Sequence, residues 1–458
     1  LLRPHREPAS RVAWIVVIVV VPVAGILAYL MLGETSVGRR RLSRRSRARA
    51  MVPLFSDIEG VEQALAAAEH HEHHASLFRM GHSISGYAPV GGNRAQLMAD
   101  SQAMIASLVT DIDAASDHVH VLFYIWLPDG NGLRVAQALI RAAGRGVVVR
   151  AMVDDLGSRE ILKHPIWADM GRAGVHQARA LQIAIPFLPT ISGRIDLRNH
   201  RKIVVIDNQI TYCGSQNCAD AAFLPKAKYG PWVDAVMRFE GPIVRQNQML
   251  FAADWMAERD DDLRPLLRQP LDSYAPGFTA QVIAEGPTDR PSAAPEMFAS
   301  LMYAARRELI VTTPYYVPVD SLQSALRAAG NRGVDVTLIL PARNDDFAVG
   351  AASRSYYEDL IAAGVKIFEY RPGLLHTKSV TMDGEMTLIG SANMDCRSFA
   401  LNFENNILLS DANLTAQMRA RQMAYLQDST RITSEMVRSW PWYRRLWNNA
   451  VAVVGPVL

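Results

Sequence analysis

One eight-residue pattern occurs twice in the chain and constrains its fold more than any other feature. The stretch "HRKIVVID" runs from His200 to Asp207, and "HTKSVTMD" runs from His376 to Asp383. In both copies a histidine and a lysine lie two residues apart, so on a strand they share one face. A core strand needs neither an imidazole nor an ammonium group. The pattern therefore predicts two strands that each carry part of a polar site.

The segments around the two copies also repeat. Residues 138–155 ("ALIRAAGRGVVVRAMVDD") resemble residues 324–342 ("SALRAAGNRGVDVTLILPA"), and each reads as a helix that ends at a glycine before a buried strand. An aromatic strand precedes each helix, at residues 120–128 and 309–318. The sequence therefore predicts an α/β fold with two duplicated lobes, each a mainly β sheet flanked by helices.

The amino-terminal segment holds the longest uncharged apolar run. The 21 residues from Val12 to Leu32 would rise about 31 Å as a helix, enough to cross a hydrocarbon core of about 30 Å. A cleaved signal peptide and a buried core helix are the alternatives to a transmembrane helix. Seven arginines follow between Arg39 and Arg49. By the positive-inside bias this cluster predicts that the folded part lies on the cytoplasmic side. The cluster either also binds the anionic headgroups there or acts as an orientation signal only. Whether a second transmembrane span precedes Leu1 stays an open question.

The domain organisation follows from these segments. We expect a membrane anchor with an Arg-rich juxtamembrane stretch at residues 1–50, a helical connector at 51–93, the two duplicated α/β lobes at 94–268 and 278–426, and an interfacial carboxyl-terminal segment at 427–458.

The charge distribution argues against a nucleic-acid partner. The formal net charge is +3, but residues 1–50 carry ten arginines and two glutamates, so the chain from Met51 onward is acidic. A nucleic-acid binder would carry its basic excess on the folded domain.

Metal ligands are not predicted. The three cysteines, Cys213, Cys218 and Cys396, lack metal-ligand spacing and are expected to be reduced thiols. The stretch "EHHEHH" from Glu69 to His74 would place two histidines on one helical face, but it lies in a polar, alanine-rich connector. A solvated helix is the favoured interpretation there.

Each copy of the pattern should fold back as a hairpin, because turn residues follow at Asp207 and Asp383. A two-residue turn would place position 200 opposite 217 and position 202 opposite 215, and in the second copy 376 opposite 393 and 378 opposite 391. The returning strands read "GSQN" and "GSAN". The predicted phosphate-binding residues are accordingly Ser215, Asn217, Ser391 and Asn393.

Such a cluster suits a phosphodiester. Lys202 and Lys378 supply positive charge, and a histidine nitrogen can attack phosphorus or carry a proton. We expect one of His200 and His376 to form a phosphohistidine while the other protonates the leaving alkoxide. With the two lysines holding the developing charge, no metal or other cofactor is expected.

At this point the chain resembles the phospholipase D superfamily, whose signature of His-x-Lys, then Asp, then Gly-Ser and Asn is complete in both copies. It is more similar still to the branch of bacterial cardiolipin synthases, over essentially the whole chain. The stretches that carry this resemblance are "FYIWLPDG", "DLRNHRKIVVIDNQITYCGSQN", "TTPYYVP" and "LLHTKSVTMDGEMTLIGSANMDCRS".

The resemblance implies transfer of a phosphatidyl group from one phosphatidylglycerol to another, with release of glycerol and formation of cardiolipin in the bacterial inner membrane. By family precedent His200 is the nucleophile and His376 the general acid and base, although the motifs themselves do not distinguish them. The family's histidine-orienting carboxylates match Asp234 and Glu404. Asp207 and Asp383 belong to the catalytic signature, but their turn positions favour a structural role.

Several features leave alternatives open. A phospholipase D hydrolase or a phosphatidylserine synthase would use the same histidines, and a non-enzymatic membrane scaffold would be expected to have lost part of a motif. The segments 181–194 and 440–447 either dock on the bilayer or pack in the core. Aromatic residues near the motifs line a lipid pocket or fill core strands, namely Tyr124, Trp126, Tyr315 and Tyr316. The oligomeric state stays open.

Overall fold

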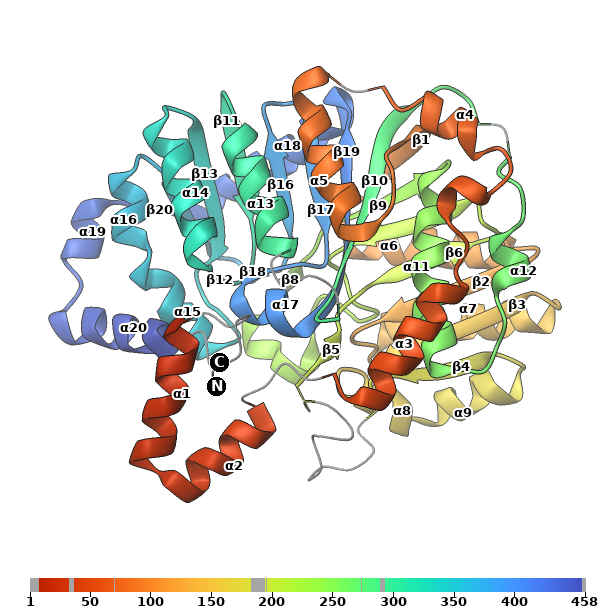
Figure 1. Cartoon of the computed structure of the whole chain (residues 1–458), viewed down its shortest axis with the longest axis horizontal. Helices are drawn as coiled ribbons and strands as arrows, with labels where there is room; N and C mark the ends of the chain where they lie inside the picture. Colours follow the sequence, from red (N-terminus) through yellow and green to blue (C-terminus); the bar gives the residue numbers. More distant parts are fainter. Residues whose placement is uncertain are drawn as a thin grey trace.

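One sheet runs through the whole folded part of the protein (Figure 1). The computed structural model describes residues 8–32, 37–69, 71–182, 194, 196–272, 274–288 and 293–454. Its main sheet has 16 strands in the order β20-β14-β13-β11-β16-β17-β19-β10-β1-β9-β7-β6-β2-β3-β4, with β5 paired to β19 off this path. The two middle strands, β1 (Val90–Leu97) and β10 (Phe278–Glu285), pair antiparallel and join the two halves.

The two halves repeat the same elements. From β1 the first half continues through α6 (Ser101–Ala114), β2 (His118–Phe123), α7 (Gly130–Gly144), β3 (Val148–Asp154), α8 (Arg159–Lys163), α9 (Pro165–Arg172), β4 (His176–Ala180), β5 (Arg198–Asn199), β6 (Ile203–Ile206), β7 (Ile210–Gly214), η3 (Leu224–Tyr229), β8 (Trp232–Val233), β9 (Val236–Glu240), α11 (Ile243–Glu258) and α12 (Arg264–Leu267).

From β10 the second half continues through α13 (Ala293–Ala304), β11 (Glu308–Thr312), β12 (Tyr316–Val317), α14 (Asp320–Asn331), β13 (Asp335–Pro341), α15 (Phe347–Ser355), α16 (Tyr357–Ala362), β14 (Lys366–Tyr370), β15 (Leu374–Leu375), β16 (Ser379–Met382), β17 (Met386–Gly390), β18 (Met394–Asp395), α17 (Cys396–Leu401), β19 (Asn402–Ser410) and α18 (Ala412–Gln427). Then come β20 (Ser429–Ile432), α19 (Ser434–Arg438) and α20 (Trp442–Val454).

This arrangement confirms the predicted α/β class and its duplication. In each half a helix is followed by a parallel strand, α7 by β3 and α14 by β13, as the repeated sequence indicated. Helices cover both faces of the sheet, because its apolar strands are buried on both sides. Helix α11 buries nearly all of its length between the sheet and the amino-terminal helix α3 (Arg39–Met51).

Two short strands cross from one half to the other. Strand β5 pairs in parallel with β19, so that Asn199 lies opposite Phe403. Strand β15 pairs in parallel with β8, so that Leu375 lies opposite Val233. Each of these crossing strands immediately precedes a histidine of the repeated pattern. The histidines are therefore fixed by backbone contacts between the halves.

Both hairpins form, but their register differs from the prediction by one residue. Ile206 pairs with Ile210 and Met382 pairs with Met386, so three residues separate the last pair of each hairpin. The turn residues Asp207 (φ 50°) and Asp383 (φ 55°) both adopt the left-handed conformation. The prediction was wrong because it counted a two-residue loop, whereas each turn takes one further residue before the ladder begins.

The predicted single transmembrane helix over residues 12–32 does not form. The segment instead contains α1 (Pro8–Val20) and α2 (Pro22–Leu32), which fold against each other, with the rings of Trp14 and Tyr29 packed edge to face at 5.4 Å. Pro22 explains the break, since proline lacks the N–H of a continuing helix and clashes with the preceding turn. In the part of the chain that the structure describes, no helix is both long and apolar enough to cross a bilayer.

The connector between α3 and β1 also differs from expectation. It contains η1 (Phe55–Asp57), α4 (Val61–Ala66), η2 (Glu72–His74) and α5 (Ala75–Ser85). The histidine-rich stretch is not one solvated helix, because η2 is a short 3-10 turn and His74 is fully buried. His70 lies outside the described residues. Helix α5 packs its apolar face on the core of the second half.

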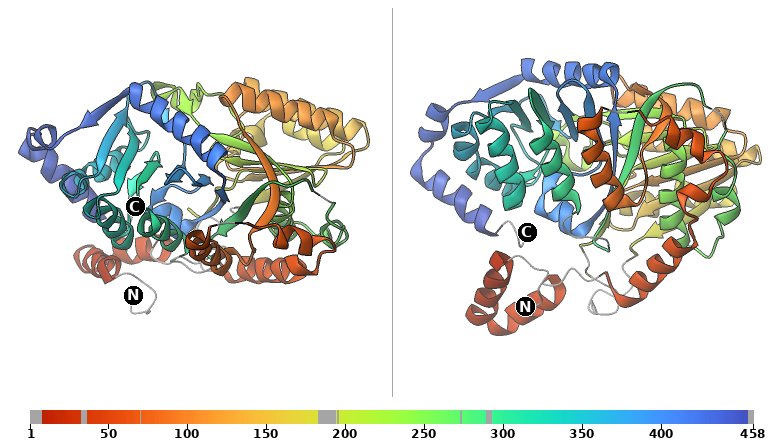
Figure 2. Two further views of the ribbon diagram at one scale, coloured as in Figure 1. Left: turned by 90° about the horizontal axis from the view of Figure 1, so that it is seen from above. Right: turned by 45° about the horizontal axis from the view of Figure 1, so that its top comes forward.

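Helices α1, α2 and α20 lie on one side of the molecule (Figure 2). Helix α20 packs against α15, with Phe347 and Trp447 rings 6.0 Å apart. The apolar side chains that these helices expose include Val12, Val16, Val19, Val20, Val23 and Leu27 on α1 and α2, and Trp442, Tyr443, Leu446, Trp447 and Val453 on α20.

Candidate active site

The two pattern histidines enter the site from opposite halves of the sheet. The backbone N–H of His200 donates to the carbonyl oxygen of Phe403 (2.9 Å), and that of His376 donates to the carbonyl oxygen of Val233 (2.8 Å). Both histidines are buried. The crossing strands β5 and β15 therefore hold each histidine against the opposite half.

Each imidazole is held by a carboxylate from the other half. Nδ1 of His200 lies 2.9 Å from Oε2 of Glu404, and Nδ1 of His376 lies 2.6 Å from Oδ1 of Asp234. The sequence singled out both carboxylates as histidine-orienting, but it did not indicate that the pairs cross. With Nδ1–H donated to a carboxylate, Nε2 of each ring is left to act on a substrate.

Burial and charge fix the ionisation of these pairs. Burial lowers the pKa of His200 and His376 to about 4 each. Burial opposes ionisation of Asp234 and Glu404, but the adjoining imidazoles outweigh it and lower the pKa of both carboxyls, that of Asp234 to about 2. At neutral pH the site therefore holds neutral imidazoles that donate to ionised carboxylates.

The two lysines lie close to both histidines. Nζ of Lys202 donates to the carbonyl oxygen of His200 (2.6 Å), and Nζ of Lys378 donates to that of His376 (2.7 Å). Burial lowers the pKa of Lys202 to about 8 and that of Lys378 to about 7. The positive charge of each lysine contributes to the lowered pKa of both histidines. The two histidines, their two carboxylates and the two lysines thus form one electrostatic cluster between the halves.

The motif serines contact the carboxylates. Oγ of Ser215 donates to Asp234 (2.6 Å), and Oγ of Ser391 donates to Glu404 (2.5 Å). The sequence indicated that these hydroxyls bind phosphate. In the structure their protons are committed to the carboxylates that orient the histidines, so each serine acts on the site through its neighbour.

The motif asparagines differ in their contacts. The side-chain oxygen of Asn217 accepts a hydrogen bond from the backbone N–H of Ile125 (3.2 Å). The amide nitrogen of Asn393 donates to Ser398 Oγ (3.1 Å), while its Oδ1 is buried without a hydrogen-bond partner among the described residues. Their predicted contact with phosphate stays a prediction.

The motif aspartates lie at the turn ends of the hairpins, away from the histidines. Asp207 accepts hydrogen bonds from the backbone N–H groups of Ser116, Asp117 and His118 at 2.8 to 2.9 Å. Asp383 accepts from those of residues 306, 307 and 308. Both carboxylates thus fasten the start of the neighbouring strand, as the structural role favoured by their turn positions predicts, and a direct catalytic role for them stays a prediction.

Aromatic rings flank both histidines. Tyr124 packs at 4.7 Å from the ring of His200, and Trp232 at 4.5 Å from the ring of His376. Trp232 was not predicted, although it adjoins Asp234 in "WVD". Of the other aromatic candidates, Trp126 and Tyr316 are core residues. The hydroxyl of Tyr315 donates to Asp345 (2.6 Å).

A buried ion-pair network behind His200 was also missed. Arg201, the residue between the motif histidine and lysine, makes two 2.8 Å contacts to Asp254 and donates to the backbone oxygen of Glu404 (3.1 Å). Arg45 of helix α3 also reaches Asp254, at 2.6 Å. The network was hidden in the sequence because its partners are far apart along the chain.

Comparison with known proteins gives concordant results. The family described as cardiolipin synthase, PLD-like domain, matches residues 108–255 and 298–424, and the family described as phospholipase D-nuclease N-terminal matches residues 1–34. Cardiolipin synthase A of Salmonella paratyphi B and that of Salmonella newport are each 38% identical to the chain over its whole length, covering 95% of each relative.

Among solved structures, phosphatidylserine synthase of Haemophilus influenzae superposes with a TM-score of 0.59 at 14% identity. The superposition covers 80% of this chain and 95% of that one. The doubled sheet and its paired His-x-Lys motifs thus define a phospholipase D-like α/β protein. Within that class, the chain belongs to the cardiolipin synthase family with a PLD-like domain.

Proposed function

We propose that the chain is a phosphatidyltransferase that makes cardiolipin and glycerol from two molecules of phosphatidylglycerol. The observation that carries the proposal is the pair of buried histidines, each oriented by a carboxylate from the opposite half and flanked by two buried lysines. Full-length similarity to cardiolipin synthase A supports the choice of substrate.

In the first step Nε2 of His200 attacks the phosphorus of phosphatidylglycerol. A P–N bond forms, the bond from phosphorus to the glycerol oxygen breaks, and His376 delivers a proton to that oxygen. The bound phosphodiester is negatively charged, so it raises the pKa of His376 and favours the imidazolium that this step needs. Lys202 and Lys378 hold the charge that develops on the phosphoryl oxygens.

In the second step the roles of His376 reverse. It takes the proton from a hydroxyl of the acceptor phosphatidylglycerol, whose oxygen attacks phosphorus as the P–N bond breaks. Glu404 and Asp234 hold the two rings in orientation through both steps. The products are cardiolipin and free His200.

Product analysis tests the proposal. Purified protein with phosphatidylglycerol vesicles should yield cardiolipin and glycerol, and His200→Ala and His376→Ala should abolish both products. His82→Ala, an exposed histidine on α5, is the matched control and should retain activity. Phosphatidic acid as the sole lipid product would make the protein a hydrolase. Phosphatidylserine formed only when serine is added would make it a phosphatidylserine synthase.

We further propose that the protein works on the cytoplasmic face of the bacterial inner membrane. Support comes from the apolar side chains exposed on α1, α2 and α20, which lie on one side of the molecule. Trp442 is 75% exposed and Trp447 is 51% exposed, as for side chains at a headgroup boundary. The exposed arginines of α3 favour an anionic leaflet.

Vesicle binding tests this orientation. In a His200→Ala background, which keeps the lipid composition constant, Trp442→Ser with Trp447→Ser should weaken binding to vesicles of phosphatidylglycerol and phosphatidylcholine by about tenfold or more. Leu54→Ser is the control, because Leu54 is equally exposed but lies in the connector. Equal binding by both variants would contradict a role for α20. Phe187 and Leu188, in the apolar segment before His200, lie outside the described residues.

A further inference from the structure

A second cluster of chemically active side chains lies at the far end of the second hairpin. His73 and His74 of η2 meet Glu385, which directly follows the turn residues Asp383 and Gly384. Among the described residues these three form a group of His, Cys, Asp or Glu whose ligand atoms all lie within 4.8 Å of one another. The cluster is distinct from the catalytic histidines, which lie at the other end of strand β16.

The distances within the cluster are wrong for hydrogen bonds. Nε2 of His73 lies 3.6 Å and Nε2 of His74 lies 3.5 Å from the same oxygen, Oε2 of Glu385. A hydrogen bond from an imidazole N–H to an oxygen is about 2.7–3.2 Å long. Two ligands that bind one Zn²⁺ at about 2.0–2.2 Å in a tetrahedron are about 3.3–3.6 Å apart. The observed spacing therefore fits the edges of a metal coordination shell.

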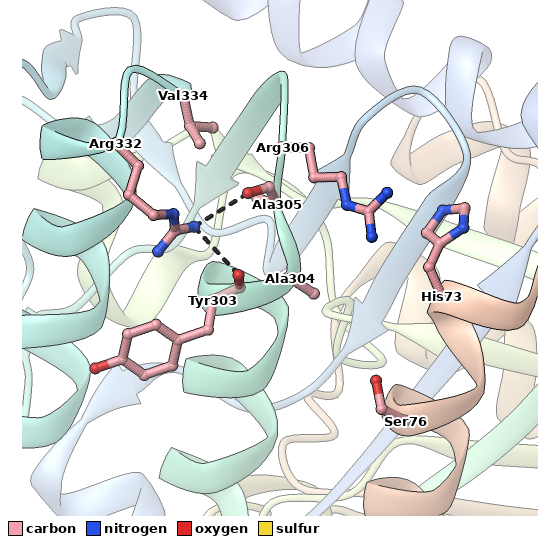
Figure 3. Close-up of a pocket in the computed structure, with 8 residues that line it drawn as sticks. All are labelled: His73, Ser76, Tyr303, Ala304, Ala305, Arg306, Arg332 and Val334. Atoms are coloured by element: carbon pink, nitrogen blue, oxygen red, sulfur yellow. Dashed lines mark hydrogen bonds between the residues drawn. The ribbon is translucent and has the colours of Figure 1, made fainter.

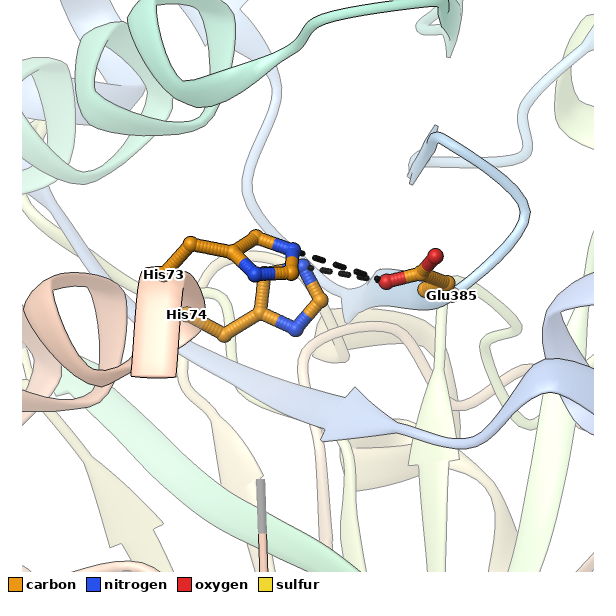
Figure 4. A group of neighbouring side chains, drawn as sticks. All are labelled: His73, His74 and Glu385. Carbon is orange, nitrogen blue, oxygen red and sulfur yellow. Dashed lines mark ion pairs between the residues drawn. The ribbon is translucent and has the colours of Figure 1, made fainter. Parts of the chain in front are cut away.

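Burial gives a second, independent indication. The side chain of His74 is 0% exposed, yet neither of its ring nitrogens has a hydrogen-bond partner among the described residues. Oε2 of Glu385 is likewise buried without one. A buried polar group that lacks a partner costs free energy, and a cation bound between them would satisfy Nε2 of His74 and Oε2 of Glu385 at once. Figure 4 shows both rings directed at the carboxylate.

Neighbouring groups leave the ligand atoms of the cluster available for an ion. The other oxygen of Glu385, Oε1, accepts a hydrogen bond from Arg307 (3.2 Å), which leaves Oε2 for the histidines. Two imidazoles and one carboxylate are donors that suit zinc and similar transition metals.

The cluster is also accessible. A surface pocket of about 400 Å³ lies beside it, lined by His73 and Ser76 of the connector and by Tyr303, Arg306 and Arg332 of the second half (Figure 3). His73 is 35% exposed and Glu385 is 30% exposed. The pocket provides a path for an ion and room for water at the remaining coordination positions.

We infer that His73, His74 and Glu385 bind one divalent transition-metal ion of the zinc class, which clamps the connector to the turn of the second catalytic hairpin. The site has no counterpart in the first half, where Gln209 takes the position of Glu385 and its turn neighbour Asn208 donates to Gln269 (3.0 Å). Within the described part of the chain, the second copy of the duplication carries this feature and the first does not.

Metal binding to the full chain tests the inference. Tag-free protein in detergent, stripped with a chelator and dialysed, is titrated with Zn²⁺ and separately with Mg²⁺. We expect one Zn²⁺ per chain, no comparable binding of Mg²⁺, and a rise of the unfolding temperature on addition of Zn²⁺. Co²⁺ in place of Zn²⁺ should give the visible absorption of a nitrogen- and oxygen-ligated ion.

Variants locate the ion. Glu385→Gln keeps the shape of the side chain and should weaken Zn²⁺ binding at least about 100-fold, with loss of the Co²⁺ spectrum. His74→Ala should do the same. His82→Ala, also on the connector, should bind as the unchanged protein does. The inference is wrong if the unchanged protein binds no Zn²⁺, or if Glu385→Gln and His74→Ala bind it as tightly as His82→Ala.

Discussion

Asp234 orients His376 and Glu404 orients His200, so replacing each carboxylate should affect a different step of the reaction. Asp234→Asn should lower turnover of phosphatidylglycerol by about 10²–10⁴-fold, because His376 loses its orientation and its stabilised charge. A phosphatidyl ester of p-nitrophenol has a leaving group that needs no proton. With this substrate Asp234→Asn should still release a rapid burst of nitrophenol as His200 becomes phosphorylated.

Glu404→Gln should behave differently, because Glu404 supports the nucleophile. This variant should show no burst with the activated ester. Stopped-flow absorbance measures both outcomes, and the unchanged protein is the control. A burst in Glu404→Gln but not in Asp234→Asn would reverse the roles of His200 and His376.

The lysines predict the pH dependence. Lys378 has a pKa lowered to about 7 and Lys202 to about 8, so both lose charge as the pH rises through that range. We therefore expect kcat/KM, measured from about pH 6 to about pH 9, to fall on the alkaline side. Lys378→Arg keeps its charge and should shift this fall to higher pH, even if its maximum is lower. An unchanged alkaline limb in Lys378→Arg would contradict the role of Lys378.

At the scale of elements, the hairpin turns predict a stability effect without a catalytic one. Asp383→Ala removes the acceptor of three backbone N–H groups at the start of β11. It should cost about 1–3 kcal/mol of unfolding free energy. At a temperature where the variant is folded, its kcat/KM should remain close to that of the unchanged protein. Loss of kcat by orders of magnitude in folded Asp383→Ala would instead show a direct catalytic role for this residue.

An ion-pair network joins helix α3 to the site, and its two arginines differ in how deeply they are buried. Arg201 and Asp254 are both almost fully buried, whereas Arg45 is partly exposed. Arg201→Ala should cost about 3–5 kcal/mol, because Asp254 loses its principal partner. Arg45→Ala should cost about 1 kcal/mol, since Arg201 remains. Thermal unfolding of the two variants in parallel measures the difference, and equal shifts would contradict this ranking.

At the scale of the whole molecule, the duplication and most of the site followed from the sequence. The repeated His-x-Lys pattern and the repeated helix–strand units are local signals, and strand and helix periodicity translate them into elements. The resemblance to the phospholipase D superfamily also identified Asp234 and Glu404. The sequence did not show that each histidine pairs with the carboxylate of the opposite half, because partners such as His200 and Glu404 are 204 residues apart.

Three local predictions failed, the first two for local reasons. The hairpin register depended on loop length, and one additional turn residue shifts every pair. The apolar run from Val12 to Leu32 was interpreted as one helix that tolerates Pro22, whereas α1 ends at Val20 and α2 begins at Pro22. The buried environment of His74 is a third case, because nothing near it in sequence indicates the contact with Glu385.

The continuous sheet predicts one cooperative unfolding transition, despite the two halves. Strands β1 and β10 pair across the junction, and β5 and β15 each complete a ladder of the opposite half. Neither half can unfold without breaking hydrogen bonds in the other. Differential scanning calorimetry of the protein in detergent should therefore show a single peak. Two resolved peaks would mean that the halves are independent.

The crossing strands also bear on synthesis. The segment 198–199 emerges from the ribosome about 200 residues before its partner strand at 402–410. Until then the newly made first half has an open strand edge and an incomplete catalytic pocket, and such edges are sites of mispairing between nascent chains. Contacts this distant in sequence also slow folding. If the amino-terminal helices bind the membrane as proposed above, binding early in synthesis would keep neighbouring nascent chains apart while the second half is still being made.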